Sequence, residues 1–430
     1  MSESRSIKVD LLTRVEGEGA LHIVFDGKNI AEVQLRIFEP PRFFEGFLQG
    51  RHYTEVPDIV ARICGICPVA YQMSAVHALE GLFALEIDPT VRSLRRLLYC
   101  GEWIESHALH IYMLHAPDFL GLASALELGQ SQPELLKQAI RLKKCGDAIL
   151  TTLGGRAVHP VSVQVGGFSR VPERFELEAL LDDLRWGRDA AVRTLQLVAG
   201  FDFPDFTQSY TYVSLQHRQE YPMNEGVIAF GQVETSALLP VADFESRFVE
   251  SQVSHSHALH CLLDGKPYIT GPLARVVLNR EKLSPLTREQ LDAVAFNPNN
   301  PQQAIIARAA EMLHALDEAI GIIEHYRKPQ HSHAAVDVVP GTAIAATEAP
   351  RGMLYHRYQV DAAGLITAAK IVPPTSQNQA RIEADLHALM PSLALADDAT
   401  IAFESERLVR SYDPCISCAT HFLKVQVDRR

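Results

Sequence analysis

The chain has 430 residues, 47% hydrophobic and 21% charged, which is the composition of a globular protein with a large core. Its net charge is −12 and it has no basic tract, so we expect neither nucleic acid nor anionic lipid as its main partner. No uncharged apolar run approaches the ~18 residues of a membrane span, and no apolar signal region is evident, so we expect no membrane span and a cytoplasmic protein.

The periodicity of apolar residues predicts a mainly helical chain with β-hairpins at its ends and flanks. Residues 6–40 are typical of strands, with Asp26 and Gly27 at a hairpin turn. Long amphipathic helices are predicted at 91–116, 133–153, 173–199 and 301–326. Further strands are predicted at 209–215, 226–236 and 354–372. The fold class we expect is α-rich α+β, with a central bundle of long helices and peripheral β-hairpins, in a single domain over 1–430.

Four of the seven cysteines form two Cys-x-x-Cys pairs at opposite ends of the chain, Cys64 with Cys67 and Cys415 with Cys418. Four thiolates make a complete tetrahedral ligand set for zinc or iron. A structural zinc is one interpretation, but zinc ribbons usually place their pairs about 15–20 residues apart on turns. A redox dithiol is another interpretation, but it needs only one pair. The wide separation favours a buried catalytic metal whose site is closed by the fold itself.

Six sequence blocks, in this order along the chain, resemble the large, catalytic subunit of nickel–iron hydrogenases. They are RVEGEG (14–19), RFFEGFLQGRHYTEVPDIVARICGIC (42–67), HIYMLHAPDF (110–119), GGRAVHPVSVQVGG (154–167), EAPRGMLYH (348–356) with VPPTSQN (372–378), and DPCISCATH (413–421). Each block is weak alone, but together they are specific and span nearly the whole chain. The resemblance implies the hydrogenase large-subunit fold and reversible heterolytic cleavage of H2 to protons and electrons.

The resemblance implies a nickel–iron centre held by all four paired cysteines. Cys64 and Cys415 would be terminal nickel ligands, and Cys67 and Cys418 would bridge to an iron that carries carbon monoxide and cyanide. Soft thiolates suit a nickel ion that changes redox state. The other cysteines show no paired spacing and are expected to be small buried side chains; they are Cys100, Cys145 and Cys261.

The same resemblance assigns catalytic roles around this centre. Arg351 would lie over the open metal edge, oriented by Asp118 and Asp413. Cys415 and Arg351 are the two candidate proton acceptors, but arginine rarely gives up a proton, so Arg351 is expected first to position and stabilise charge. Glu16 would be the first carboxylate of a proton relay, whereas Glu18 fits an exposed turn position.

Further residues are expected to surround the metals. Thr375 and the Pro350–Arg351 segment would hydrogen-bond the cyanides. Glu45 and His421 would bind a magnesium or iron(II) ion near the C-terminus. His159 could be a core histidine or a neighbour of the site, and the sequence leaves both interpretations open.

One residue departs from the common family pattern. Many relatives have a histidine four residues after the bridging cysteine, where this chain has Tyr71. A phenol can donate a hydrogen bond toward sulfur but cannot become a charged imidazolium. With tyrosine at this position, the chain resembles the cytoplasmic, NAD(P)-linked, sulfhydrogenase-like branch of the family.

The electrons are expected to leave through other proteins. The chain has no further cysteines arranged for iron–sulfur clusters and no Gly-x-Gly-x-x-Gly between a strand and a helix. The resemblance implies a small iron–sulfur subunit and flavin- and NAD(P)-binding diaphorase-type subunits. It also implies nickel-insertion factors and a maturation protease. That protease would remove the tail 422–430, which follows the metal-binding segment 411–421, although the alternating apolar and polar residues of the tail also fit a strand that this branch retains. The alternative function is that of a non-enzymatic, zinc-stapled subunit of a multisubunit redox complex, and a different metalloenzyme is a further alternative.

Overall fold

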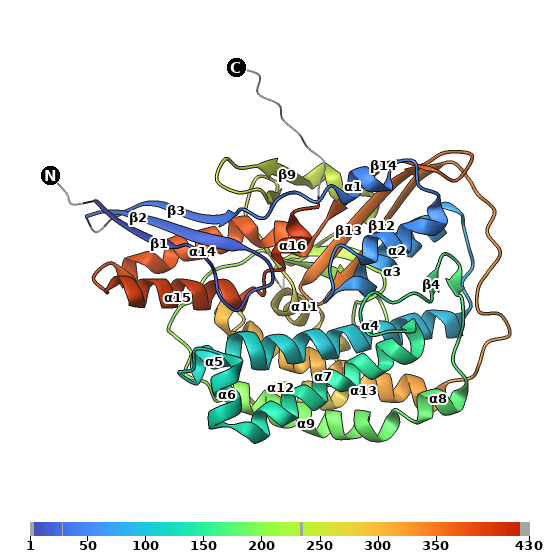
Figure 1. Ribbon diagram of the computed structural model, residues 1–430, viewed down its shortest axis with the longest axis horizontal. Coiled ribbons are helices and arrows are strands. Elements are labelled where there is room, and N and C mark those ends of the chain that lie inside the picture. The colour runs from blue at the N-terminus through green and yellow to red at the C-terminus, as the bar shows by residue number, and fades with distance from the viewer. Residues whose placement is uncertain (1–3, 28, 233–234, 422–430) are drawn as a thin grey trace, which may run out of the picture.

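A bundle of long helices forms the lower half of the molecule (Figure 1). Its members are α4 (Pro89–Leu109), α7 (Pro133–Gly154), α9 (Leu181–Ala199) and α13 (Ala304–His325). The structure, a computed structural model, describes residues 4–27, 29–232 and 235–421. The tail 422–430, which the sequence predicts to be removed, lies outside the described residues. The α-rich α+β class and the central bundle are as predicted.

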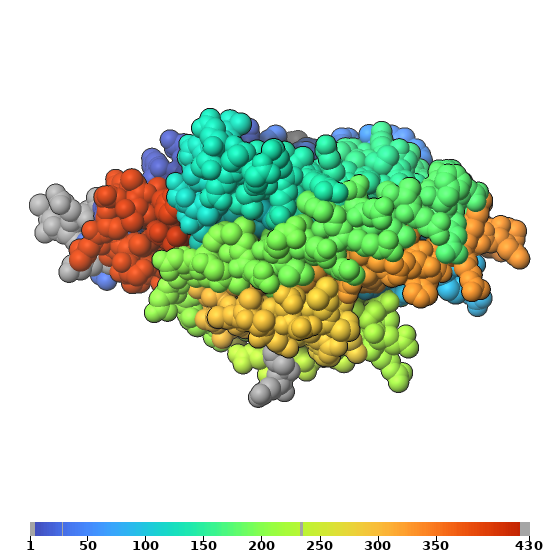
Figure 2. All heavy atoms as spheres, turned by 90° about the horizontal axis from the view of Figure 1, so that it is seen from below, coloured from blue at the N-terminus to red at the C-terminus, as the bar shows by residue number. Residues whose placement is uncertain are grey.

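The predicted apolar face of α4 is buried against α7 and α13. Proline occupies the first turn of α4 and α7, where a missing N–H costs nothing. Seen from below, α6 to α9 and the golden α12 cover this side of the molecule (Figure 2). The bundle therefore covers the interior that the upper elements close from the other side.

The remaining helices are mostly short and lie around the bundle and above it. Their bounds are α1 (Phe44–Leu48), α2 (Val56–Ala61), α3 (Pro68–Leu82), α5 (Ala116–Phe119), α6 (Ala125–Ser131), α8 (Arg174–Glu178), α10 (Phe244–Arg247), α11 (Pro272–Asn279), α12 (Pro285–Asp292), α14 (Pro374–Leu393), α15 (Asp398–Ser411) and α16 (Ile416–Ala419).

Two antiparallel three-stranded sheets lie above the bundle. One contains β1 (Ser4–Val9), β2 (Gly19–Asp26) and β3 (Asn29–Ile37), and the other contains β12 (Gly341–Ala349), β13 (Gly352–Val360) and β14 (Ile366–Val372). A mixed sheet has the order β11 (Ile269–Thr270), β6 (Tyr212–Gln216), β7 (Val227–Gly231) and β8 (Ala237–Leu239). Two hairpins complete the set, β9 (Phe248–Gln252) with β10 (Leu259–Leu263), and β4 (Val163–Gln164) with β5 (Gly167–Phe168).

The structure corrects two predicted helices and adds strands. The helix predicted at 173–199 is divided into α8 and α9. The helix predicted at 91–116 leaves the α-helical pattern after α4, where residues His110–His115 form a π-helical turn. Strand β12 and the β9–β10 hairpin were not predicted, because their sequences lack clear alternation of apolar and polar residues.

Candidate metal centre

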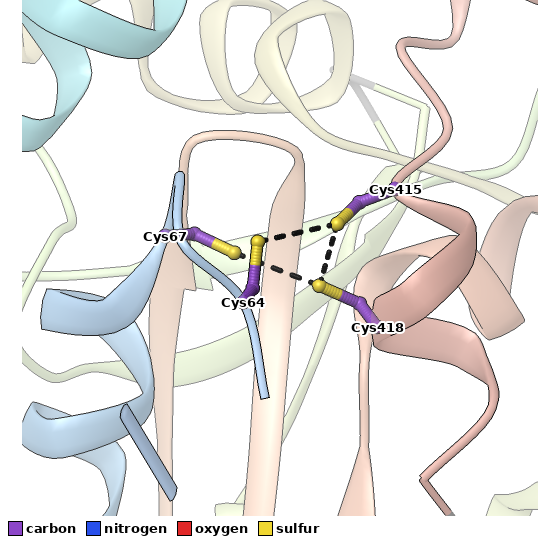
Figure 3. A group of neighbouring side chains, drawn as sticks. All are labelled: Cys64, Cys67, Cys415 and Cys418. Carbon is purple, nitrogen blue, oxygen red and sulfur yellow. Dashed lines mark hydrogen bonds between the residues drawn. The ribbon is translucent and has the colours of Figure 1, made fainter. Parts of the chain in front are cut away.

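The two Cys-x-x-Cys pairs meet in the interior, with their four sulfur atoms pointing toward one another (Figure 3). The sulfur atoms of Cys64 and Cys415 are 3.4 Å apart, those of Cys67 and Cys418 are 3.7 Å apart, and those of Cys415 and Cys418 are 2.7 Å apart. All four lie within 4.8 Å of one another and all four residues are buried. Tetrahedral metal–sulfur bonds of ~2.3 Å would place neighbouring sulfurs ~3.8 Å apart, so the spacing fits a shared metal site.

Burial and the closeness of the four sulfurs shift the pKa values of these thiols. Burial raises the pKa of Cys415, and its hydrogen bonds with the neighbouring sulfurs raise it further. The hydrogen bond from Cys415 lowers the pKa of Cys64 well below its ordinary value. Buried sulfurs this close favour a bound cation, because a cation lets them all ionise together. The donor set is therefore suited to soft metals of the nickel and iron type.

Backbone and side-chain contacts fix both cysteine segments. Helix α3 starts directly after Cys67, and the buried carboxylate of Glu102 on α4 accepts hydrogen bonds from the first free amides of α3, at 2.6 Å from Val69. Arg42 donates to the carbonyl oxygen of Ile63, at 2.6 Å, and to that of Ser417. Arg42 thus ties the first cysteine segment to the second, a role that nothing in the sequence indicated.

Glu16 lies directly beside the C-terminal cysteines. Its Oε2 accepts hydrogen bonds from the Cys415 thiol at 3.0 Å and from the amide of Ser417 at 3.1 Å. Its carbonyl oxygen accepts a hydrogen bond from the amide of Ile416 at 3.0 Å. This close approach requires glycine next in the chain, because Gly17 has φ +86° and an added Cβ would lie 2.7 Å from a side-chain atom of Ile416. Glu18 is exposed, as expected.

Arg351 is buried at the tight turn between β12 and β13. Its Nε donates to the carbonyl oxygen of Asp413 at 2.9 Å, and its Nη2 donates to the carboxylate of the same residue at 3.0 Å. Burial acts to lower the pKa of Arg351, but Asp413 and the thiolates outweigh it and the pKa is raised. Nη1 is buried without a hydrogen-bond partner in the described chain. The guanidinium therefore stays charged and keeps one donor available beside the sulfurs.

A second buried arginine holds this turn in place. Arg275 donates to the carbonyl oxygen of Pro350 at 2.8 Å and pairs with Glu311 at 2.7 Å and Glu348 at 2.9 Å. Burial acts to raise the pKa of Glu311, but Arg275 outweighs it and lowers the pKa to about 2. Burial dominates at Glu348 and raises its pKa to about 7. Sequence reasoning missed this network, because the three charged residues lie in three unrelated helices and strands.

The predicted pairing of Asp118 with Arg351 is wrong. Asp118 pairs with Arg410, with distances of 2.8 and 2.9 Å, and also with Arg14. Arg410 lies in the last turn of α15, which leads into the segment of Asp413, and Arg14 precedes Glu16. Asp118 therefore joins the N-terminal and C-terminal segments of the site, and of the two aspartates predicted to orient Arg351 it is Asp413 that contacts it. The sequence block HIYMLHAPDF gave no sign of which arginine its aspartate would meet.

The Thr375 hydroxyl accepts a hydrogen bond from the amide of Cys415 at 3.0 Å. Its own proton remains available, because a hydroxyl can donate while it accepts. Thr375 lies at the start of α14 and is buried. It is therefore placed to contact a group bound beside Cys415.

Glu45 and His421 approach each other at the end of the described chain. Their nearest charged atoms, Oε1 and Nε2, are 4.0 Å apart. The backbone of Ile371 lies between them, since its amide donates to Glu45 at 2.8 Å and its carbonyl oxygen is 2.7 Å from Nε2 of His421. A carboxylate, a carbonyl oxygen and an imidazole suit magnesium or iron(II). The carbonyl of Ile371 is a candidate ligand that no sequence pattern could reveal.

Tyr71 and His159 lie near the cysteines in different ways. Tyr71 is fully buried, and burial, followed by the charges of Cys418 and Cys67, raises the pKa of its phenol, which therefore stays protonated. His159 is partly exposed and lies beside Gly65, so it is a neighbour of the first cysteine segment and not a core histidine. The unpaired cysteines are buried, as expected; they are Cys100, Cys145 and Cys261.

The sequence profile of a family described as nickel-dependent hydrogenase matches residues 42–146 and 245–421, which include all four clustered cysteines. The chain belongs to the nickel-dependent hydrogenase family. It is 31% identical to the alpha subunit of sulfhydrogenase 1 from Pyrococcus furiosus, over 97% of this chain and 98% of that protein. It is 25% identical to subunit beta of the NAD-reducing hydrogenase HoxS from Cupriavidus necator, over 98% of this chain and 95% of that protein.

The fold of this hydrogenase subunit agrees with solved structures. A crystal structure of an NAD+-reducing [NiFe]-hydrogenase in the H2-reduced state superposes with a TM-score of 0.86 at 27% identity, covering 98% of this chain and 100% of that chain. The Ni-Fe-Se hydrogenase of D. vulgaris Hildenborough has the same fold at 21% identity, with a TM-score of 0.80 and coverage of 97% and 100%. The chain is therefore the large, catalytic subunit of a nickel-dependent hydrogenase. No helix in the described parts of this subunit could span a membrane.

Proposed function

We propose that this chain carries the nickel–iron site of an NAD(P)-linked hydrogenase and cleaves H2 reversibly into two protons and two electrons. The observation that carries the proposal is the convergence of four buried sulfurs from opposite ends of the chain within 4.8 Å. Cys64 and Cys415 would bind nickel terminally, and Cys67 and Cys418 would bridge nickel to an iron that carries carbon monoxide and cyanide. When bound, the centre supplies the electron-pair acceptor that polarises H2 for heterolytic cleavage.

The chain supplies a path for the proton released at the site. The thiolate sulfur of Cys415 accepts the proton, and Oε2 of Glu16, 3.0 Å away, receives it next. That distance allows direct transfer along an existing hydrogen bond. The partly exposed Glu16 then delivers the proton toward solvent, whereas the sulfurs themselves stay buried.

Arg351 acts by position and charge. It stays protonated beside the sulfurs, and Asp413 holds its planar group through two hydrogen bonds. A fixed positive charge in a dry site stabilises the negative charge that develops when H2 is split. Its free Nη1, with the hydroxyl of Thr375 and the backbone of Pro350–Arg351, would contact the cyanide ligands.

A second ion would stabilise the C-terminal segment. Glu45, His421 and the carbonyl oxygen of Ile371 would bind magnesium or iron(II) and hold the segment that carries Cys415 and Cys418. Removal of residues 422–430 by a maturation protease would follow nickel insertion.

The electrons leave through partner subunits. Two curated relatives are the alpha subunit of a sulfhydrogenase and a subunit of an NAD-reducing hydrogenase. By that likeness, a small iron–sulfur subunit would take the electrons from the site, and flavin-bearing diaphorase-type subunits would pass them to NAD(P) in the cytoplasm.

Infrared spectroscopy of the purified holoenzyme tests the site directly. Bands of iron-bound carbon monoxide and cyanide, with nickel and iron at one equivalent each, are the expected result. The matched control is the Cys64→Ser variant, which should lose the nickel. A zinc-loaded protein without these bands would instead support the zinc-stapled alternative and overturn the proposal.

A further inference from the structure

A second cluster of metal-binding side chains lies at the middle of α14. His255, His260 and Glu383 place one ligand atom each within 4.8 Å of the others. His255 lies in the loop between β9 and β10, His260 in β10 and Glu383 on α14, and α14 packs against both β10 and β3. The cluster thus joins the β9–β10 hairpin to a helix that is distant in the chain. It is separate from the sulfurs, because Glu383 lies eight residues beyond Thr375 on the helix, which is ~12 Å along its axis.

Hydrogen bonds orient the carboxylate of Glu383, but no lysine or arginine of the described chain balances its charge. Its Oε1 accepts a hydrogen bond from the amide of Leu35 at 2.8 Å and lies 2.7 Å from Nε2 of His255. Its Oε2 lies 4.0 Å from Nδ1 of His260, which is too far for a hydrogen bond. Among the described residues, no lysine or arginine forms an ion pair with Glu383. Within the described ranges, the ionisable group within hydrogen-bond distance of this half-buried carboxylate is His255, which balances its charge only when protonated.

An ion pair between His255 and Glu383 does not explain the environment of His260. It is 5% exposed, and its Nε2 has no hydrogen-bond partner in the described chain. A pair between His255 and Glu383 satisfies those two residues and leaves the second imidazole without a partner. The other nitrogen of His260, Nδ1, faces the carboxylate without reaching hydrogen-bond distance. A cation shared by the three side chains would give Glu383, His255 and Nδ1 of His260 a common partner.

The distances fit a small divalent cation. Metal bonds of ~2.0 Å to nitrogen and oxygen in a tetrahedral site place neighbouring ligand atoms ~3.3 Å apart. The observed separations of 2.7 and 4.0 Å lie on either side of that value, so small side-chain movements suffice. Two imidazoles and one carboxylate are typical zinc ligands and leave a fourth position for water. The partly exposed His255 and Glu383 leave that position accessible.

Another group of candidate ligands does not meet these conditions. His217, Glu220 and Glu225 also lie within 4.8 Å of one another. Arg92 already pairs with both carboxylates, at 2.5 and 2.6 Å, so no further cation is needed there.

We propose that His255, His260 and Glu383 form a zinc site that clamps the β9–β10 hairpin onto α14. The site is independent of the nickel–iron centre. Its role is structural: α14 begins at Pro374 beside Thr375, and zinc would hold the other part of that helix against β10 and β3.

The test measures zinc and nickel in the purified holoenzyme and in three variants, after equilibration with zinc and removal of the excess. His255→Ala/His260→Ala removes two ligands. Glu383→Gln removes the charge but keeps an acceptor for the amide of Leu35. His257→Ala is the matched control, because His257 is exposed and lies in the same loop without belonging to the cluster.

We expect one equivalent of zinc in the wild-type protein and in His257→Ala, and none in the other two variants. Added zinc should raise the Tm of the first two proteins only, because it binds only to their folded state. Nickel content should be equal in all four, which separates this site from the one proposed for catalysis. Equal zinc binding in all four proteins would overturn the proposal. If the double variant does not fold, the comparison of Glu383→Gln with His257→Ala decides.

Discussion

The carboxylate of Glu16 lies 3.0 Å from the sulfur of Cys415, although the two residues are 399 positions apart in the chain. The backbones meet as well, through the amide of Ile416 and the carbonyl oxygen of Glu16. The candidate proton acceptor and the candidate relay group are therefore positioned by the same contact, and Gly17 makes that contact sterically possible.

Glu16→Gln should preserve the metal centre and abolish fast proton transfer. The amide keeps an acceptor for Ser417 but cannot carry a proton to solvent. We expect exchange between H2 and deuterated water to fall at least ~10²-fold, the usual contribution of a general acid or base. Glu18→Gln is the control, because Glu18 is exposed two residues away. Unchanged exchange in Glu16→Gln with full nickel content would place the proton path elsewhere.

Arg351→Lys should assemble with metal and turn over slowly. Lysine keeps the charge but cannot make both hydrogen bonds to Asp413 or present a planar group beside the sulfurs. We expect kcat to fall about 10²-fold, the loss typical of removing one fixed electrostatic donor. Arg174→Lys, at an exposed ion pair, is the control. Wild-type kcat in Arg351→Lys would show that positive charge alone suffices.

Asp118→Asn should reduce stability, because Asp118 forms buried ion pairs with Arg14 and Arg410. It would leave Arg14 and Arg410 without their shared carboxylate in a buried position. The expected loss in the free energy of unfolding is about 3–5 kcal/mol. Glu178→Gln, which removes an exposed pair with Arg174, should cost at most ~1 kcal/mol. Denaturant unfolding compares the two variants, and equal losses would contradict the joining role of Asp118.

Glu348 should make stability depend on pH. Burial raises its pKa from 4.5 to about 7 in the folded protein, against the opposing effect of Arg275. Between these values the folded state binds more protons than the unfolded state, so the free energy of unfolding falls as pH rises. The expected contribution is about 3 kcal/mol over this window. The lowered pKa of Glu311 acts in the opposite direction, but only below pH 4.5.

The check is denaturant unfolding from pH 4.5 to pH 7 for the wild-type protein and for Glu348→Gln. Glutamine keeps an acceptor for the amide of Leu215, which donates to Glu348 at 2.6 Å. We expect a shallower fall in stability for this variant, with Glu178→Gln behaving like the wild-type protein. The same slope in Glu348→Gln would show that Glu348 does not titrate in this range.

The elements with strong local signals could be predicted from the sequence alone. Helices α4, α7 and α13 follow from apolar periodicity and from proline in the first turn or just before it. The β2–β3 hairpin follows from its alternating pattern and the turn after Asp26. The spacing within each cysteine pair and the order of the six blocks also indicated a nickel-dependent hydrogenase. Each pair and each block consists of neighbouring residues, so it can be recognised in the sequence without the fold.

Which distant groups meet depends on how the chain packs and could not be predicted from the sequence. By its sequence, Asp118 could pair with any buried arginine. In the packed structure it pairs with Arg410 and Arg14 and not with Arg351. Arg42, Arg275 and the carbonyl oxygen of Ile371 carry no sequence signal, because their roles depend on positions in space and, for Ile371, on a backbone atom that every residue has. Buried charges must find partners, but which partners they find is fixed by how the helices and sheets pack.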